Sequence, residues 1–227
     1  MNRKSKVELV SLWKSADCVC FDVDSTVCVN EAIDDLAEYA GVGSQVQELT
    51  LKAMGGNMTF KQALQMRLSI IRPSKNIIDG FNRSDKCQLT PKIKDLINTL
   101  HDRNIPVYLV SGGFRVFINP VAELLNIKTE RVFANTIKFD HNDEYENFDE
   151  SELTCESGGK GKVIQLLKDT HGYNRVVMIG DGWTDFESCP PADGFIGFGG
   201  NAVREKVKSN SEWFVHDFQE LIDVLIN

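Results

Sequence analysis

The sequence has no long hydrophobic run. Its 227 residues contain no stretch of about 18 apolar positions, and Glu8, Lys14 and Asp17 interrupt the N-terminal segment in which a secretory leader needs an apolar centre. We therefore expect neither a membrane-spanning helix nor a cleaved leader. With 42% hydrophobic and 26% charged residues, the composition is that of an ordinary globular protein, and we expect a soluble, cytoplasmic chain.

The sequence also lacks the cysteine and histidine patterns of zinc sites. No Cys-x-x-Cys pair occurs among the six cysteines, and the four histidines are scattered. Six cysteines are enough for three disulfides, but a chain of this length buries a core without them. We expect Cys18 and Cys20 to be buried in a strand as small hydrophobic residues. Any metal is then expected to be a hard cation bound by oxygen.

Positive charge is scarcer than negative charge. Lysine and arginine number 25 against 33 aspartates and glutamates, which gives a net charge of −8. Nonspecific binding to nucleic acid or to an anionic membrane surface is therefore disfavoured. A small anionic substrate would need a site at which the sign of the charge is locally reversed.

The first third of the chain is predicted to be mostly helical. A short helix is expected over 5–15 and a buried strand over 18–23. Helical patterns without a strand signal then run from about 31 to 84, and Pro73 ends one of them. This region is predicted to be a helical cap, residues 31–85, inserted after the first strand.

From Pro91 onward, helices and strands alternate. The predicted elements are a helix at 92–103, a strand at 107–110, a helix at 114–125, strands at 132–136, 176–179 and 195–198, a helix at 160–170 and a terminal helix. Such alternation favours an α/β fold with a doubly wound, Rossmann-like parallel sheet. Residues 1–30 and 86–227 are predicted to form this catalytic core, with a hairpin over 139–148 added to one edge of the sheet.

Carboxylates follow two of the predicted strands. Ligands of open α/β sheets bind beyond the carboxyl ends of the strands. Asp22 and Asp24 follow the first strand, and residues two apart in extended chain point the same way, about 6.6 Å from each other. Asp181 and Asp185 follow the strand at 176–179, where Gly180 and Gly182 permit a tight turn, and they suit Mg²⁺. The alternative is that these aspartates only form turns and helix caps.

Two further segments offer contacts to an anion. Ser111 with Gly112 and Gly113 follows the strand at 107–110, where backbone N–H groups are able to approach an anion, although a plain turn is the alternative. The lysine-containing segment 158–162 lacks the serine or threonine of a nucleotide-binding P-loop. Lys160 is instead a candidate to deliver positive charge to a phosphoryl group, or it is a solvated lysine.

Four segments of the chain resemble, in this order, the four signature motifs of the haloacid dehalogenase superfamily: Asp22-x-Asp24-x-Thr26, Ser111, Lys160 and Gly180-Asp181-x-x-x-Asp185. Over about 14–227, further residues make the chain similar to the phosphoserine phosphatase family: Glu31, Ala53-Met-Gly-Gly56, Arg67, Val110-Ser-Gly-Gly113 and Gly180-Asp-Gly-x-Thr-Asp185. Trp183 departs from this pattern because it is bulkier than expected, and we expect it to alter packing near the metal site.

The resemblance implies a Mg²⁺-dependent hydrolysis of O-phosphoserine to serine and phosphate, the last step of serine biosynthesis, in a homodimer. Asp22 is the implied nucleophile and forms an aspartyl phosphate, while Asp24 acts as general acid and base. The implied metal ligands are Asp22, the backbone carbonyl of Asp24, and Asp181. Asp185 is implied to orient Lys160 or the metal shell.

The resemblance also implies the residues that bind the substrate. They are Ser25, Glu31, Met54, Gly55, Arg67, Ser111, Gly112, Gly113, Lys160 and Thr184. Glu31 and Arg67 match the ammonium and carboxylate of phosphoserine, although a glutamate near a helix start and an arginine on a helix surface are common without such a role.

Two alternative functions remain at this point. One is a related phosphatase or phosphotransferase for another small phosphorylated metabolite. The other is a nonenzymatic phospho-aspartate switch, which is disfavoured because switch modules of this kind are much shorter and have neither a helical cap nor a general acid. Steady release of phosphate distinguishes an enzyme from a switch.

Overall fold

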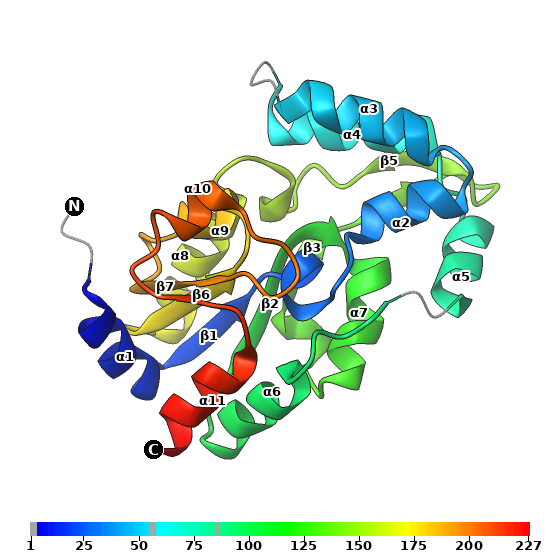
Figure 1. Cartoon of the computed structure of the whole chain (residues 1–227). Helices are drawn as coiled ribbons and strands as arrows, with labels where there is room; N and C mark the ends of the chain where they lie inside the picture. Colours follow the sequence, from blue (N-terminus) through cyan, green and yellow to red (C-terminus); the bar gives the residue numbers. More distant parts are fainter. Residues whose placement is uncertain (1–3, 55–57, 85–86) are drawn as a thin grey trace.

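The computed structural model describes residues 4–54, 58–84 and 87–227, without the side chains of 51–54. Six parallel strands form one sheet in the order β3-β2-β1-β6-β7-β8 (Figure 1). Their bounds are β1 Cys18–Phe21, β2 Val107–Phe114, β3 Val132–Asn135, β6 Val176–Gly180, β7 Gly194–Phe198 and β8 Phe214–Val215. The predicted doubly wound, Rossmann-like fold is confirmed.

Alternation along β1 explains why helices cover both faces of the sheet. Val19 and Phe21 face a core cluster that includes residues of α1 (Lys6–Lys14), α6 (Ile93–Asp102), α7 (Arg115–Leu124) and α11 (Phe218–Ile226). Cys18 and Cys20 point to the opposite face, on which α8 (Gly159–His171), α9 (Trp183–Phe186) and α10 (Glu205–Lys208) pack. Both cysteines are buried, as predicted. A strand with both faces covered must be apolar throughout.

Helices α2 to α5, here called the cap helices, follow β1 directly. They span Ala32–Tyr39, Gly43–Met54, Phe60–Ile71 and Lys75–Arg83. Helix α4 begins with a reciprocal hydrogen-bonded cap between Thr59 and Gln62 and ends at Ile71, two residues before Pro73. Leucines of α2 and α4 form a second core cluster together with Phe114 and Phe117, so the cap helices pack on the carboxyl end of β2.

The predicted hairpin forms, but its predicted position is wrong. Strands β4 (Ile137–Phe139) and β5 (Tyr145–Phe148) pair with each other in a separate two-stranded sheet. Ile137 and Phe148 are buried in the cluster of the cap helices. Alternating hydrophobicity indicates strands, but it does not identify the partner that their apolar face covers.

Two strands end at other places than predicted. Strand β1 stops at Phe21, and the chain turns through η1 (Val23–Val27). Strand β2 continues through Gly113 to Phe114, with an irregular register against β3. The elements β8 and α10 were not predicted, because two and four residues are too short to show a hydrophobic period.

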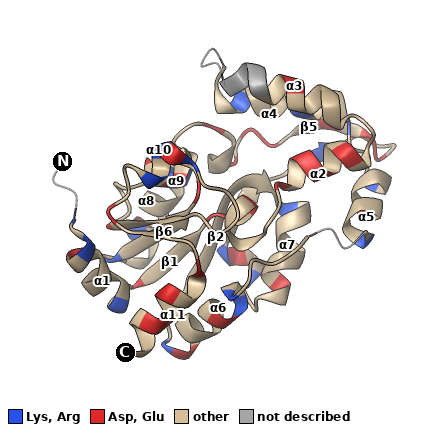
Figure 2. Cartoon of the chain, in the orientation of Figure 1, with Lys and Arg blue, Asp and Glu red and all other residues tan. Residues whose placement is uncertain are grey.

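Helices in the described part of the chain are too short or too polar to cross a membrane. Figure 2 shows acidic and basic residues together on helices α1 and α6. In α1, for example, Glu8 lies between Lys6 and Lys14.

Candidate active site

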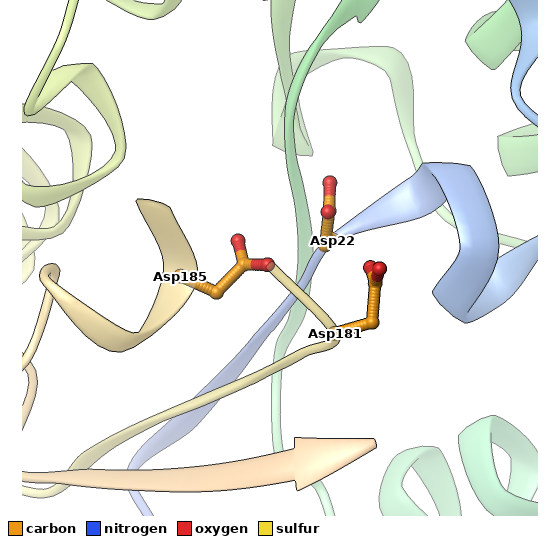
Figure 3. A group of neighbouring side chains, drawn as sticks. All are labelled: Asp22, Asp181 and Asp185. Atoms are coloured by element: carbon orange, nitrogen blue, oxygen red, sulfur yellow. The ribbon is translucent and has the colours of Figure 1, made fainter. Parts of the chain in front are cut away.

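Three aspartates meet at the carboxyl edge of the sheet. Asp22 follows β1, Asp181 follows β6, and Asp185 lies in α9; one carboxylate oxygen from each is within 4.8 Å of the others (Figure 3). Their side chains are buried, with Asp185 fully enclosed. Strands β1 and β6 are paired in register from Cys18 with Val176 onward, so their ends lie at the same height.

Lys160 neutralises part of this acidic group. Its Nζ atom lies 2.7 Å from Asp22 Oδ1 and 2.5 Å from Asp185 Oδ1. Burial alone disfavours the ammonium form, but the two carboxylates raise the pKa of Lys160 above its ordinary value. Lys160 comes from the first turn of α8 and is 7% exposed, so it is not the solvated lysine that the sequence left open.

Arg204 supplies a second positive charge, which sequence reasoning missed. Its Nε atom lies 2.6 Å from Asp181 Oδ2, and its Nη2 atom lies 3.0 Å from Glu31 Oε1. Asp181 also accepts a hydrogen bond from Thr26 Oγ1 at 3.2 Å. Arg204 precedes α10, in the segment that follows β7. Its place beyond the carboxyl end of a strand was the available signal.

Asp24 lies outside the three-carboxylate group but lines the same cavity as Asp22. Its Oδ1 accepts the backbone N–H of Ala32 at 2.9 Å, and its Oδ2 lies 3.5 Å from Ser111 Oγ. Burial raises the pKa of Asp24 to about 8, with smaller contributions from the charges of Glu31 and Asp22. A carboxyl group with this pKa carries a proton at neutral pH, as a general acid requires.

The Ser111 segment is shaped by two glycines. A Cβ atom at Gly112 would lie 2.6 Å from Phe60 Cζ, and one at Gly113 would lie 2.9 Å from Asp24 Oδ2. The N–H of Gly113 donates to Ser111 Oγ at 2.9 Å. Larger residues would therefore push Phe60 of the cap helices, or Asp24, out of place. The segment belongs to β2, not to the strand-to-helix turn that the sequence also allowed.

Glu31 and Arg67 line the cavity from the cap side. Glu31 accepts a hydrogen bond from Ser25 Oγ at 2.9 Å in addition to Arg204, and it makes no side-chain cap of α2. Burial raises the pKa of Glu31. The Nε atom of Arg67 is buried and has no hydrogen-bond partner within the described part of the chain. A buried donor without a partner is costly in free energy unless a ligand satisfies it.

The cavity has a volume of about 370 Å³ and joins both groups of residues. Thr184 and Trp183 line it as well. Trp183 stacks on Phe186 at a centroid distance of 4.6 Å, and Lys206 Nζ lies 3.5 Å from its ring centre. Gly55 and the side chain of Met54, both predicted to line the pocket, lie outside the described part of the structure.

Comparisons with known proteins identify the family of this chain. The family model of haloacid dehalogenase-like hydrolases matches residues 16–193. Phosphoserine phosphatases from Bos taurus and Homo sapiens are each 52% identical to this chain over 221 residues, covering 97% of this chain and 98% of the relative. A solved substrate-bound phosphoserine phosphatase complex is 25% identical, with a TM-score of 0.79 over 92% of this chain and 97% of its own. The chain therefore belongs to the phosphoserine phosphatase family of the haloacid dehalogenase-like hydrolases.

Proposed function

We propose that this protein hydrolyses O-phosphoserine to serine and inorganic phosphate, the last step of serine biosynthesis, through an aspartyl phosphate on Asp22. One observation carries the proposal. A single cavity joins the buried Asp22 and Lys160 to Glu31 and to Arg67, whose buried Nε atom has no hydrogen-bond partner among the described residues. Phosphoserine carries a phosphate, an ammonium and a carboxylate, and the cavity offers a nucleophile, an acid and a guanidinium.

The reaction proceeds in two steps. In the first, an Asp22 oxygen attacks phosphorus, and the serine oxygen leaves with the proton of Asp24. In the second, Asp24 removes a proton from a water molecule that attacks the same phosphorus, so that phosphate leaves and Asp22 is regenerated. In the metal-free site the pKa of Asp24 is about 8, which suits an acid that starts the first step protonated.

Positive charge and hydrogen-bond donors hold the phosphoryl group. Lys160 already contacts Asp22 Oδ1 and lies where it neutralises the developing negative charge. Ser111 Oγ lies within reach of Asp24 and is the proposed hydroxyl donor to a phosphoryl oxygen. Asp185 fixes the Lys160 ammonium from the far side, and Thr184 and Ser25 are proposed as substrate-side hydroxyls.

The carboxylates at the sheet edge fit a divalent cation. Asp22, Asp181 and Asp185 bring oxygens within 4.8 Å of one another, and oxygen ligands of this kind suit Mg²⁺. Burial raises the pKa of both Asp181 and Asp185, which shows how poorly their charges are solvated. We propose Asp22, Asp181 and the backbone carbonyl of Asp24 as the ligands. Bound Mg²⁺ would neutralise charge on the phosphoryl oxygens.

Glu31 and Arg67 are proposed to select the substrate. The Arg67 guanidinium would bind the carboxylate of phosphoserine, which would give its Nε donor a partner. Glu31 would bind the ammonium group. It now contacts Ser25 and Arg204, and these contacts keep its carboxylate in the cavity.

We also propose the division of the chain into a core (1–30 and 86–227) and a cap (31–85), a homodimer, and a cytoplasmic location. The cap helices pack in a hydrophobic cluster distinct from the two clusters that cover the sheet, which supports the division, although Phe114 and Phe117 of the core contribute to that cluster. Size-exclusion chromatography with light scattering measures the oligomeric state, and a monomer at assay concentration would contradict the dimer.

Phosphate release from a panel of substrates tests the proposed function. The panel contains O-phosphoserine, O-phosphothreonine, phosphotyrosine and sugar phosphates, each with Mg²⁺ or with EDTA. We expect strong selectivity for phosphoserine and loss of activity in EDTA. Metal-dependent activity without that selectivity would favour another small phosphorylated metabolite and would contradict the roles of Glu31 and Arg67. No release from any substrate would favour a phospho-aspartate switch.

A further inference from the structure

Two cysteines lie beside each other where the cap helices join the rest of the chain. Cys28 precedes the cap helices and Cys87 follows them, and their Sγ atoms are 3.1 Å apart. Both are thiols in this structure. Because the sulfurs of a disulfide are about 2.05 Å apart, these two need to approach each other by only about 1 Å.

The backbone holds the two thiols together without a covalent bond. Cys28 lies opposite Leu89 in an antiparallel bridge, and the N–H of Val29 donates to the carbonyl of Gln88 at 2.8 Å. Residues two apart in an extended segment share a face, so Cys87 lies diagonally across from Cys28 on the face of Leu89. The two connections between cap helices and core thus form a short paired segment.

The two thiols differ in their access to solvent. Cys28 is 5% exposed, whereas Cys87 is exposed. Cys18, Cys20 and Cys155 are buried. An oxidant in solution therefore meets Cys87 first and has Cys28 within reach of the sulfur it has modified.

We propose that Cys28 and Cys87 form a reversible disulfide that fastens the two cap connections to each other and slows turnover. The thiolate of Cys87 attacks a low-molecular-weight disulfide and expels one small thiolate, which leaves a mixed disulfide on Cys87. The thiolate of Cys28 then attacks the Cys87 sulfur and expels the second small thiolate. The two protons lost from the protein end on the two small thiols, so two protein sulfurs are oxidised and one small disulfide is reduced.

The position of the pair explains the expected effect on turnover. On the chain, Cys28 lies between Asp24, the proposed acid, and Glu31, a proposed substrate ligand. Lids that open and close over an active site move on the segments that join them to the rest of the chain. A bond across both connections restricts that motion.

The second chemical step is expected to accelerate with pH. In the reduced protein, the hydrogen bond to Cys87 raises the pKa of Cys28 most, and burial raises it further. Once Cys87 carries the small thiol, its thiol hydrogen bond is gone, and burial is the cause that remains. Few Cys28 thiolates are therefore present at neutral pH, and closure of the disulfide from the mixed disulfide is expected to be faster in mildly alkaline buffer.

Oxidation of the full-length protein with glutathione buffer tests the site. After thiols are blocked with a maleimide, peptide mapping should find a cross-link between the peptides of Cys28 and Cys87, lighter than the two thiol peptides by two hydrogen atoms, which disappears on reduction. Since the bond closes a loop spanning 59 sequence positions, we expect Tm to rise by about 5 °C or more. A glutathione adduct that stays on Cys87, or a different cysteine pair, would overturn the proposal.

Matched variants separate the pair from other thiols. Cys87→Ser and Cys28→Val should abolish the shift in Tm, whereas Cys189→Ser, which removes another accessible thiol, should retain it. The effect on turnover is measured by phosphate release and therefore rests on the proposed function. Peptide mapping and Tm test the disulfide itself and do not depend on that function. Oxidised wild type should show a kcat about threefold or more lower than reduced protein, restored by reductant. An unchanged kcat despite a formed disulfide would overturn the control of turnover.

Discussion

The sheet edge and the cap side of the cavity differ in how completely their polar groups are partnered. At the sheet edge, Lys160 is paired with both Asp22 and Asp185, and all three side chains are under 10% exposed as residues. On the cap side, Glu31 is bonded to Ser25 and Arg204 but its side chain is 39% exposed, and the Arg67 Nε atom has no hydrogen-bond partner among the residues that the structure describes. Groups fixed before substrate binds favour the reaction, whereas unpartnered groups are available to a ligand. This difference supports the proposed roles of the sheet edge in the chemistry and of the cap side in selecting the substrate.

The buried carboxylates at the sheet edge are expected to lower the stability of the fold. Burial is the main reason that the pKa values of Asp24, Asp181 and Asp185 are raised. Gathering carboxylates in a buried place opposes folding unless cations compensate them. The proposed active site is therefore expected to be a region in which loss of a charge stabilises the protein while it destroys activity.

The largest effect is expected from Asp22→Asn. The variant keeps the size of the side chain but removes the nucleophile, so phosphate release should fall by about 10⁴-fold or more for every phosphomonoester. The assay compares O-phosphoserine with p-nitrophenyl phosphate. A loss confined to phosphoserine would contradict the assignment of Asp22 to chemistry rather than selection.

Asp24→Asn is expected to reduce steady-state turnover of phosphoserine by about 10²–10⁴-fold, because serine leaves poorly without a proton and water attacks poorly without a base. With p-nitrophenyl phosphate, whose leaving group needs no proton, the first step should survive. Rapid mixing should then show a burst of nitrophenolate close to one per active site, followed by slow turnover. Absence of any burst would count against a role of Asp24 in the second step.

Arg67→Met is expected to lower kcat/KM for phosphoserine by about 10²-fold, since the substrate carboxylate would lose a charged partner. Activity toward p-nitrophenyl phosphate, which has no such carboxylate, should stay within about twofold of wild type. Arg83→Met, at an exposed position of helix α5, is the matched control and should leave both unchanged. Equal losses on both substrates would show that Arg67 serves chemistry or folding.

The smallest effect concerns stability and pH in the absence of metal. The folded-state pKa of Asp24 is raised from 3.8 to about 8, so its protonated form stabilises the fold fully below pH 4, and this contribution is lost as pH rises through about 8. The uncharged amide introduced by Asp24→Asn would not titrate, so the free energy of unfolding of the variant would not fall with pH for this reason. Urea unfolding in EDTA measures the free energy of unfolding of both proteins. Between pH 5 and pH 8, the value for Asp24→Asn should rise relative to that of wild type by at least about 1 kcal/mol. A constant difference between the two proteins across this range would contradict the raised pKa.

The sequence predicts the sheet-edge side better than the cap side for a physical reason. Asp22 and Asp181 directly follow apolar strands, and parallel strands bring such positions to one edge whatever the details of packing. Arg204 also follows a strand, β7, which was an available signal for its place, but its contact with Glu31 spans 173 positions of sequence and no local pattern reports that contact. The same holds for the hairpin, whose alternation predicted strands but not the cap helices that cover them.

Acid quenching during turnover tests the central claim most directly. Wild type and Arg67→Met are each mixed with O-phosphoserine or with p-nitrophenyl phosphate, quenched, and mapped by mass spectrometry for a phosphoryl group on the peptide that contains Asp22. The account predicts the adduct from both substrates in wild type, but at subsaturating concentrations far less from O-phosphoserine than from p-nitrophenyl phosphate in Arg67→Met. No adduct on Asp22, or equal labelling by both substrates in the variant, would contradict it.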